Sequence, residues 1–253
     1  MKERIAIIDS GIGGLPIFNQ FIRHITCVTY LADNKFFPYG TKDDIELINI
    51  LDRIIFYFLN HRYQKVVLAC NTASYIYHKY LKYKYKDCVV SIIEDTIDDL
   101  NGINHLCNVG IVATNHVVKS NIYSDLIKEK YPVETITLPA SELVKLCEEN
   151  DKTGIEDFIK NHFHVFKTKN IDALILGCTH FNLIEKEISN FFNNQIPIIC
   201  SGYSLINQFI QNDLCLTCGR NMIYLTDYQK KYIDKIKFLF KDLRNIKIQA
   251  LNI

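Results

Sequence analysis

The stretch VVLACNTAS at residues 66–74 decides how the chain can fold. Its apolar first half predicts a short buried strand, which ends at Cys70, and residues typical of a helix start follow. The stretch ALILGCTHF at residues 173–181 repeats this order, with Cys178 in place of Cys70. Ligands of open α/β sheets sit beyond the carboxyl ends of the strands, so we expect both thiols to lie at such an edge.

Strand-like and helix-like segments alternate through the first part of the chain. The expected strands are Ile5–Ile8, Thr26–Leu31, Val66–Ala69 and Val89–Ile93. The expected helices are Leu15–His24, Asp43–Arg62 and Ser74–Lys86. The apolar face of the longest helix is expected at Ile45, Ile48, Leu51, Ile55 and Phe58. This alternation predicts a parallel sheet covered by helices on both faces.

The same pattern begins again near the middle of the chain. The expected strands of the second half are Val109–Thr114, Thr135–Leu138, Ala173–Cys178 and Pro197–Cys200. The expected helices are Val117–Tyr131, Ser141–Glu149, Gly154–Phe166 and Leu183–Phe192. We therefore predict two α/β domains related by duplication. The first comprises residues 1–95 plus 208–253 and carries Cys70; the second comprises residues 96–207 and carries Cys178. The helices expected at Ser204–Gln211 and from Asp227 onward would return the chain to the first domain.

Composition narrows the class of protein. Of 253 residues, 48% are hydrophobic and 23% charged, as in an ordinary folded protein. The formal net charge is +1 with no dense basic run, which gives no reason to expect a nucleic-acid partner. No apolar stretch reaches the roughly 18 residues of a membrane span, and no signal-peptide pattern precedes the first strand. We expect a cytoplasmic protein that binds no membrane.

Nine cysteines form an odd set without a disulfide-scaffold spacing, so reduced thiols are expected. Five of them are expected to fill the core: Cys27, Cys88, Cys107, Cys147 and Cys200. The pair Cys215 and Cys218 forms a CxxC motif. Because two further ligands at suitable spacing are missing, we expect no metal there.

Asp9-Ser10-Gly11-Ile12-Gly13-Gly14 follows the first expected strand and precedes a helix. It does not match the dinucleotide-binding fingerprint, and no acidic residue lies at a convincing distance for ribose binding. Its glycines allow close backbone approach, and the helix start offers N–H groups to a carboxylate or phosphate. A tight turn alone would also explain the glycines. Asp9 itself, at a strand end, needs a partner.

Two strand-end thiols suggest a chemistry. A cysteine has a pKa near 8.5, and a following helix start favours the thiolate, so we expect a lowered pKa. Facing thiols could remove a proton from one side of a carbon and return one to the other, which is racemisation without a cofactor. His180 could assist Cys178 or be structural. Asn71, Thr72 and Thr179 could hold a carboxylate or only cap helices.

Four motifs together resemble bacterial glutamate racemases in order and spacing, across essentially the whole chain. They are Asp9-Ser10-Gly11-x-Gly13-Gly14, Pro38-Tyr39-Gly40, Ala69-Cys70-Asn71-Thr72-Ala73-Ser74 and Gly177-Cys178-Thr179-His180. The resemblance implies two pseudo-symmetric, Rossmann-like α/β domains with parallel-rich sheets and an active site in the cleft between them. It further implies interconversion of L- and D-glutamate without a cofactor or metal, supply of D-glutamate for peptidoglycan, and a homodimer.

The resemblance also assigns roles to residues. Cys70 would act on the D-enantiomer and Cys178 on the L-enantiomer, assisted by Asp9, His180 and Glu148. For Glu148 a solvated helical position remains an alternative, and Glu149 is adjacent. Substrate binding would involve Ser10, Tyr39, Gly40, Asn71, Thr72, Thr114 and Thr179.

The chain departs from the family pattern at two places. Asn115-His116-Val117 stands where a second threonine is common, and Asn182 replaces a usual proline. These changes bear on substrate affinity and on a turn more than on the reaction type.

Three alternatives stay open. One is another racemase of the superfamily, for aspartate or hydantoins, or a decarboxylase; the presence of both cysteines favours a racemase, and His180 favours glutamate. Another is an amino-acid-binding relative without catalysis. The third is a thiol redox protein, which would need the Cα atoms of the two cysteines within about 7 Å.

Overall fold

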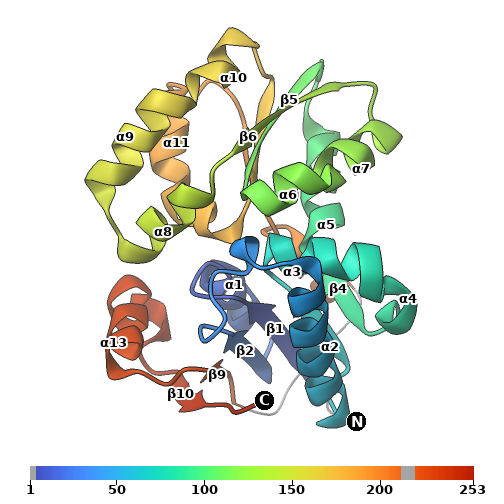
Figure 1. The fold of residues 1–253 in the computed structure, drawn as a ribbon, viewed down its shortest axis with the longest axis vertical. Coiled ribbons are helices and arrows are strands. Elements are labelled where there is room, and N and C mark those ends of the chain that lie inside the picture. The colour runs from blue at the N-terminus through green and yellow to red at the C-terminus, as the bar shows by residue number, and fades with distance from the viewer. Residues whose placement is uncertain (1–3, 212–219) are drawn as a thin grey trace. The chain divides into compact units, whose positions relative to one another are not determined.

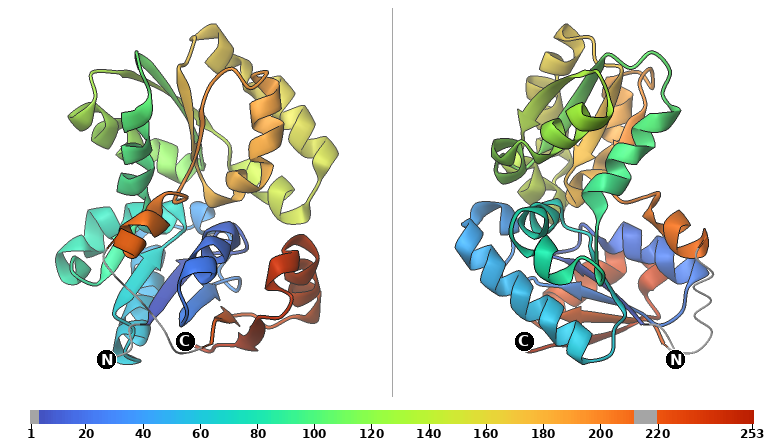
Figure 2. Two further views of the ribbon diagram at one scale, coloured as in Figure 1. Left: turned by 180° about the vertical axis from the view of Figure 1, so that it is seen from behind. Right: turned by 90° about the vertical axis from the view of Figure 1, so that its right-hand side faces the viewer.

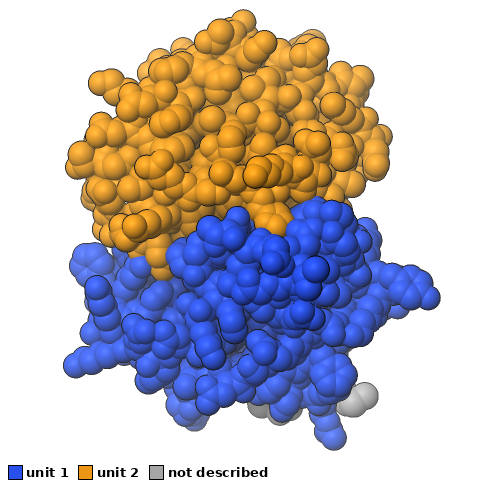
Figure 3. All heavy atoms as spheres, in the orientation of Figure 1, with its two compact units in different colours: residues 1–92, 205–253 blue, residues 93–204 orange. Residues whose placement is uncertain are grey.

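The computed structural model describes residues 4–211 and 220–253, so the Cys215–Cys218 motif lies outside the described residues. The chain divides into two compact units: residues 1–92 with 205–253, and residues 93–204 (Figure 3). The predicted boundaries lie three residues further along the chain at both crossings, at 95 against 92 and at 208 against 205.

The first unit is built on a six-stranded parallel sheet in the order β10-β9-β2-β1-β3-β4. Its strands are β1 (Ile5–Asp9), β2 (Val28–Ala32), β3 (Lys65–Leu68), β4 (Val89–Ser91), β9 (Met222–Leu225) and β10 (Lys247–Ala250). The central strands β1 and β2 are buried along their whole length. Such continuous apolar runs are typical of parallel strands covered on both faces.

Helices cover both faces of this sheet, with α1 and α2 on opposite sides (Figure 2). The helical segments are α1 (Leu15–His24), η1 (Tyr39–Thr41), α2 (Asp44–Asn60), α3 (Asn71–Ile76), η2 (Tyr77–Leu81), α4 (Lys82–Tyr85), α12 (Leu205–Gln211), α13 (Lys230–Leu239) and η5 (Lys241–Leu243). A side-chain cap begins α2, where the Asp43 carboxylate accepts a hydrogen bond from the Glu46 N–H at 2.8 Å.

The second unit has a four-stranded parallel sheet in the order β6-β5-β7-β8. Its strands are β5 (Asn108–Ala113), β6 (Glu134–Pro139), β7 (Ala173–Gly177) and β8 (Ile198–Cys200). Its helical segments are α5 (Ile92–Asp98), which begins at the unit boundary, η3 (Asp99–Gly102), α6 (Asn115–Ser120), α7 (Ile122–Lys130), α8 (Ser141–Glu149), α9 (Lys152–His162), α10 (His164–Thr168), η4 (Thr179–Ile184) and α11 (Glu185–Phe191). Helices α8, α9 and α11 gather on one side of the sheet, and α6 and α7 lie on the other (Figures 1 and 2).

Strand order relates the two units. The segment β2-β1-β3-β4 of the first sheet has the same order as β6-β5-β7-β8 of the second. In the first sheet Ile8, the residue before the last of β1, pairs with Leu68. In the second sheet Ala113, the last residue of β5, pairs with Gly177. The residue after Leu68 is therefore equivalent to Gly177. The next residues, Cys70 and Cys178, are therefore equivalent. This confirms the predicted fold class of two related α/β units with parallel sheets.

The prediction of a helical tail from Asp227 onward is wrong in part. It contains α13, but it ends in strand β10, and the preceding strand β9 was not predicted. Both strands have only four residues and lie toward one edge of the sheet. Only every second residue of β9 is buried and no residue of β10 is, so neither shows the continuous apolar run of a central strand. The tail does return to the first unit, as expected, because β9 pairs with β2.

Two predicted helices also differ. Ile45 is 73% exposed, so it does not belong to the buried face of α2, which instead includes Leu47 and Ile54. The helix expected over 117–131 is two helices, because Asn121 adopts a left-handed conformation with φ of 57°.

The structure describes seven cysteines, all as free thiols. Of the five expected in the core, Cys147 and Cys200 are buried, Cys27 and Cys88 are half-buried, and Cys107 is exposed. The expectation was therefore wrong for Cys107, which immediately precedes β5 at the sheet surface. In the described ranges no helix is both long and apolar enough to cross a membrane.

Candidate active site

Cys70 lies two residues after the end of β3 and immediately precedes helix α3. Its side chain is 8% exposed, and its Sγ atom lies 4.0 Å from the Ser10 hydroxyl. The neighbouring Asn71 and Thr72 are also buried. The structure thus brings one predicted catalytic residue and one predicted substrate-binding residue into direct contact.

The expected lowering of the Cys70 pKa is wrong. Burial, followed by the negative charge of Asp9, raises the pKa of the thiol to about 12. The backbone N–H groups of Ala73 and Thr72 and the Ser10 hydroxyl act in the opposite direction. The helix start does favour the thiolate, as the sequence indicated, but the desolvation of the sulfur outweighs it.

Asp9 is fully buried at the end of β1. Its Oδ1 atom accepts a hydrogen bond from the Gly11 N–H at 2.8 Å, which satisfies part of the need for a partner. The Tyr30 hydroxyl donates to the Gly11 carbonyl at 2.7 Å and so holds the turn from the neighbouring strand. A Cβ at Gly14 would meet Ala69 and Asp9 side-chain atoms at 3.0 Å, so close approach requires a glycine here.

Tyr39 is 1% exposed at the start of η1, with Gly40 beside it. Its hydroxyl donates to Oδ2 of Asp33, 2.5 Å away. Burial raises the Tyr39 pKa well above 10, and the nearby negative charge of Asp33 and the charges of Cys70 and Asp9 add to this. Tyr39 is thus a neutral phenol close to two predicted catalytic groups. Asp33 was not among the site residues predicted from the sequence.

In the second unit, Cys178 follows β7 and precedes η4. Cys178 is 7% exposed and Thr179 is 1% exposed. A Cβ at Gly177 would lie 2.9 Å from the Ala113 Cβ and 3.2 Å from the Tyr123 ring. Tyr123, which sequence reasoning missed, is buried, and burial raises its pKa. The strand end that carries Cys178 is therefore closely packed.

Glu148 and His180 form a buried pair. Glu148 Oε2 lies 2.8 Å from His180 Nε2, and the two residues are 7% and 2% exposed. The pair joins α8 to η4, so the helix register selects Glu148 over Glu149, which is exposed. The solvated alternative for Glu148 is thereby excluded, while its role in catalysis stays a prediction.

Thr114 caps helix α6, because its hydroxyl accepts a hydrogen bond from the Val117 N–H at 3.3 Å. Asn115 lies at the exposed start of the same helix. At the second departure from the family pattern, Asn182 is 6% exposed and donates from Nδ2 to the Ser201 carbonyl at 3.0 Å. The amide thus ties η4 to the residue after β8, a contact that proline would not make.

The structure gathers the predicted residues into two groups. The first unit brings together Cys70, Ser10, Asp9 and Tyr39, while the second places His180 and Glu148 beside each other. Within residues 4–211 and 220–253, no group of three or more His, Cys, Asp or Glu side chains could hold a metal ion.

Comparison with known proteins adds to this geometry. The sequence model of the Asp/Glu/Hydantoin racemase family matches residues 37–208, more than half of the chain. A glutamate racemase of Limosilactobacillus reuteri is 29% identical, over 88% of this chain and 83% of that protein. A glutamate racemase of Clostridium novyi is 30% identical, over 78% of each chain. The crystal structure of a Francisella tularensis glutamate racemase in complex with D-glutamate is similar with a TM-score of 0.86 and 25% identity, covering 99% of this chain and 98% of that one.

The chain belongs to the Asp/Glu/hydantoin racemase family. This membership confirms the resemblance found in the sequence and the prediction of an isomerase of the racemase class.

Proposed function

We propose that this protein is a glutamate racemase that interconverts L- and D-glutamate through two cysteine bases. The main support for this proposal is the structural equivalence of Cys70 and Cys178. Cys70 lies after β3, which pairs with β1, and Cys178 lies after β7, which pairs with β5, so the two cysteines occupy the same register position in their units. Both are buried free thiols. A binding protein or a one-base enzyme would not require a thiol at both positions.

In the proposed reaction, the Cys70 thiolate removes the α-hydrogen of D-glutamate as a proton. The Cys178 thiol donates its proton to the opposite face of the resulting carbanion, which gives L-glutamate. Cys70 ends as the thiol and Cys178 as the thiolate, so the reverse reaction begins from that state. The proposal requires the two units to act on one substrate carbon.

The raised pKa of Cys70 sets a condition for this reaction. A thiol with a pKa of about 12 is protonated at neutral pH. The substrate brings an ammonium group, and a positive charge near the sulfur lowers the thiol pKa. We therefore expect the thiolate to form when substrate occupies the site.

Assisting roles follow the two groups of residues. Asp9 would interact with the substrate ammonium group beside Cys70, while His180, held by Glu148, would serve the Cys178 side. The other predicted residues, which lie at strand ends, in η1 and in the first turn of α3, would bind the substrate carboxylates: Ser10, Tyr39, Gly40, Asn71, Thr72, Thr114 and Thr179. Most of these side chains are buried, so their hydrogen-bonding groups act in a low-dielectric setting.

Glutamate is preferred over aspartate for two reasons. The matching relatives in Limosilactobacillus reuteri and Clostridium novyi are named glutamate racemases. The buried His180–Glu148 pair also supplies an imidazole two residues after Cys178, and His180 is the residue that favours glutamate in the sequence. We further propose that the D-glutamate supplies peptidoglycan synthesis in the cytoplasm, and that the chain forms a homodimer.

The test uses purified protein and L-glutamate in deuterated water. We expect loss of the circular dichroism signal, with deuterium at the α-carbon appearing first in D-glutamate. Parallel reactions contain L-aspartate and a hydantoin. Exchange with aspartate but not glutamate would replace this proposal by an aspartate racemase, and tight binding without any exchange would favour the non-catalytic relative.

A further inference from the structure

Asp33 lies at the end of β2, next to Asp9 at the end of β1. The backbone N–H of Asp33 donates to the Asp9 carbonyl at 2.8 Å. Its side chain is 1% exposed, and Oδ2 accepts the hydrogen bond from Tyr39. Asp33 therefore connects the strand end that bears one proposed catalytic group to a proposed substrate-binding residue.

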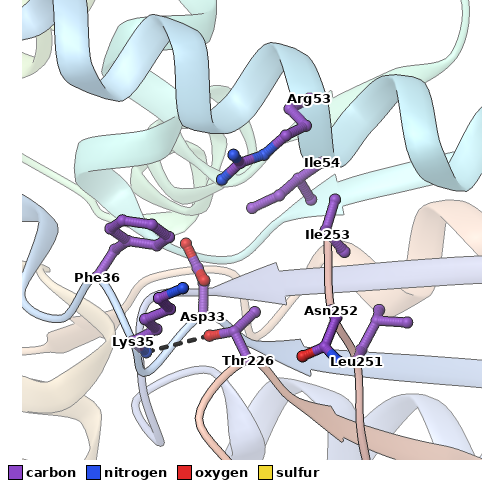
Figure 4. Close-up of a pocket in the computed structure, with 9 residues that line it drawn as sticks. All are labelled: Asp33, Lys35, Phe36, Arg53, Ile54, Thr226, Leu251, Asn252 and Ile253. Carbon is purple, nitrogen blue, oxygen red and sulfur yellow. Dashed lines mark hydrogen bonds between the residues drawn. The ribbon is translucent and has the colours of Figure 1, made fainter.

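The other side of the carboxylate borders a pocket of about 60 Å³. Figure 4 shows the carboxylate extending toward Arg53 and Ile54, with the Phe36 ring beside it. Burial raises the Asp33 pKa, whereas the hydrogen bond from Tyr39 and the positive charges of Arg53 and Lys42 lower it. A buried carboxylate held among cations is a strong hydrogen-bond acceptor.

The second unit shows that the fold itself does not need this carboxylate. The Ala140 N–H donates to the Ala113 carbonyl at 2.8 Å, which repeats the bond between Asp33 and Asp9. Ala32 pairs with Asp9 as Pro139 pairs with Ala113, so Ala140 is equivalent to Asp33. The same strand end is built with alanine in the second unit, although burying a carboxylate is costly.

We propose that Asp33 is a positioning residue for substrate binding, which acts by holding the Tyr39 hydroxyl and thereby the segment Pro38-Tyr39-Gly40. A phenol has one proton to donate. Because Tyr39 donates it to Asp33, the phenol oxygen presents only acceptor lone pairs to its other neighbours. The ring is fixed at both ends, by its backbone in η1 and by its hydroxyl. This inference rests on the proposed racemase function, and it deepens that function without adding a new site.

The test compares Asp33→Ala and Asp33→Asn in both reaction directions. A hydrogen bond to a charged group contributes about 1.5–3 kcal/mol, which corresponds to roughly 10–100-fold in affinity. We expect Asp33→Ala to raise KM by about tenfold or more for both enantiomers, with kcat changed less. Asp33→Asn retains an acceptor for Tyr39 and should recover most of the loss. The exposed Asp242→Asn is the control for removal of a carboxylate from the same unit and should leave KM unchanged.

Tyr39→Phe and the double variant Asp33→Ala/Tyr39→Phe decide whether the two residues act together. If Asp33 acts through Tyr39, the double variant is no worse than the more impaired single variant. Losses that multiply, or an unchanged KM in Asp33→Ala, would overturn the positioning role. Circular dichroism melting verifies that each variant is folded; if Asp33→Ala unfolds, the comparison of Asp33→Asn with Tyr39→Phe still tests the claim, since only the latter should raise KM.

A spectroscopic readout separates this inference from the proposed function. In protein labelled with ¹³C at tyrosine Cζ, the Tyr39 signal is identified by its absence in Tyr39→Phe. It should shift in Asp33→Ala and remain near its original position in Asp242→Asn. Wild-type protein that neither racemises nor binds glutamate would overturn the proposed function and remove the basis of the inference. If the wild type is active but Asp33→Ala changes neither the Tyr39 signal nor KM, the inference is overturned and the proposed function is not.

Discussion

The two strand-end cysteines occupy equivalent positions but have different neighbours. Cys70 has a hydroxyl and a buried carboxylate close by, from Ser10 and Asp9. In the second unit the residue equivalent to Asp9 is Ala113, and the acid–base groups lie further along, in the His180–Glu148 pair. The duplicated fold therefore fixes where the thiols are, while unrelated local substitutions determine the electrostatic surroundings of each one.

The largest expected effect tests whether the two thiols are equivalent in function. Cys70→Ala and Cys178→Ala should each lower kcat for racemisation by about 10²–10⁴-fold, because each removes one of two required proton carriers. The measurement is circular dichroism of glutamate, started from either enantiomer. Cys200→Ala is a matched control, since Cys200 is also buried but is the last residue of β8 and lies outside the proposed machinery. Substantial racemisation in either strand-end variant would end the two-base proposal.

The next prediction concerns the pair found only in the second unit. Glu148→Ala leaves His180 Nε2 buried without its partner, so we expect kcat to fall about 10–100-fold, a range within that of general acid–base assistance. The free energy of unfolding should also fall by about 1–3 kcal/mol. Glu148→Gln retains an acceptor, so both its kcat and its free energy of unfolding should fall less. Urea unfolding and steady-state kinetics provide the measurements.

The adjacent Glu149 is the control for this prediction, because it is exposed and only 3.9 Å from Lys145 in an exposed ion pair. Glu149→Gln should change neither kcat nor stability. Equal effects at positions 148 and 149 would show that the buried pair has no special role.

These results indicate what the sequence could predict. The strands that lead to Cys70 and Cys178 were predictable because each contains a short buried apolar run that is followed by polar residues. Strands β9 and β10 were not, because β9 pairs with β2 from a distant part of the chain, β10 pairs only with β9, and the burial of both is incomplete. Ile45 was misplaced because it lies in the first turn of α2, before the buried stripe begins.

The residues of the candidate site also divide into those that the sequence predicted and those that it could not. The family resemblance placed the assisting glutamate at Glu148 with Glu149 adjacent, and the structure distinguishes the two, since Glu148 contacts His180 whereas Glu149 is exposed. Asp33 and Tyr30 could not be assigned from sequence, because their roles depend on where side chains of neighbouring strands point. The predicted direction of the Cys70 pKa shift was wrong, because the sequence reveals that a helix begins after Cys70 but not how deeply the thiol is buried.

The Asp9 carboxylate beside Cys70 gives a prediction with opposite signs in two measurements. Asp9→Asn removes a negative charge that raises the Cys70 pKa, so that pKa should fall below its wild-type value of about 12. The thiolate absorbance near 240 nm measures this, with Asp9→Asn/Cys70→Ala as the reference. Turnover of D-glutamate should nevertheless slow, about 10-fold, because the proposed partner of the substrate ammonium is lost.

The same thiol gives a pH dependence of stability. The Cys70 pKa is raised from 9.0 to about 12 by folding, so its contribution to stability is complete below pH 9 and is lost as the pH rises toward 12. Cys70→Ala should therefore lose less stability than wild type between these pH values, as measured by urea unfolding. Equal losses in both proteins would contradict the raised pKa.

The smallest expected effect concerns Asn182, which stands where the family often has proline. Asn182→Ala loses the hydrogen bond to the Ser201 carbonyl, but it also removes Oδ1, which has no hydrogen-bond partner among the described residues. These changes offset each other, so the free energy of unfolding should change by less than about 1 kcal/mol, with kinetic constants unaltered. Asn182→Asp keeps the shape of the side chain but replaces the donor by an acceptor that faces the Ser201 carbonyl, so it should be clearly less stable than Asn182→Ala. Were Asn182→Ala to alter KM instead, this position would take part in substrate binding, and the contrast between the units would extend beyond the groups beside each thiol.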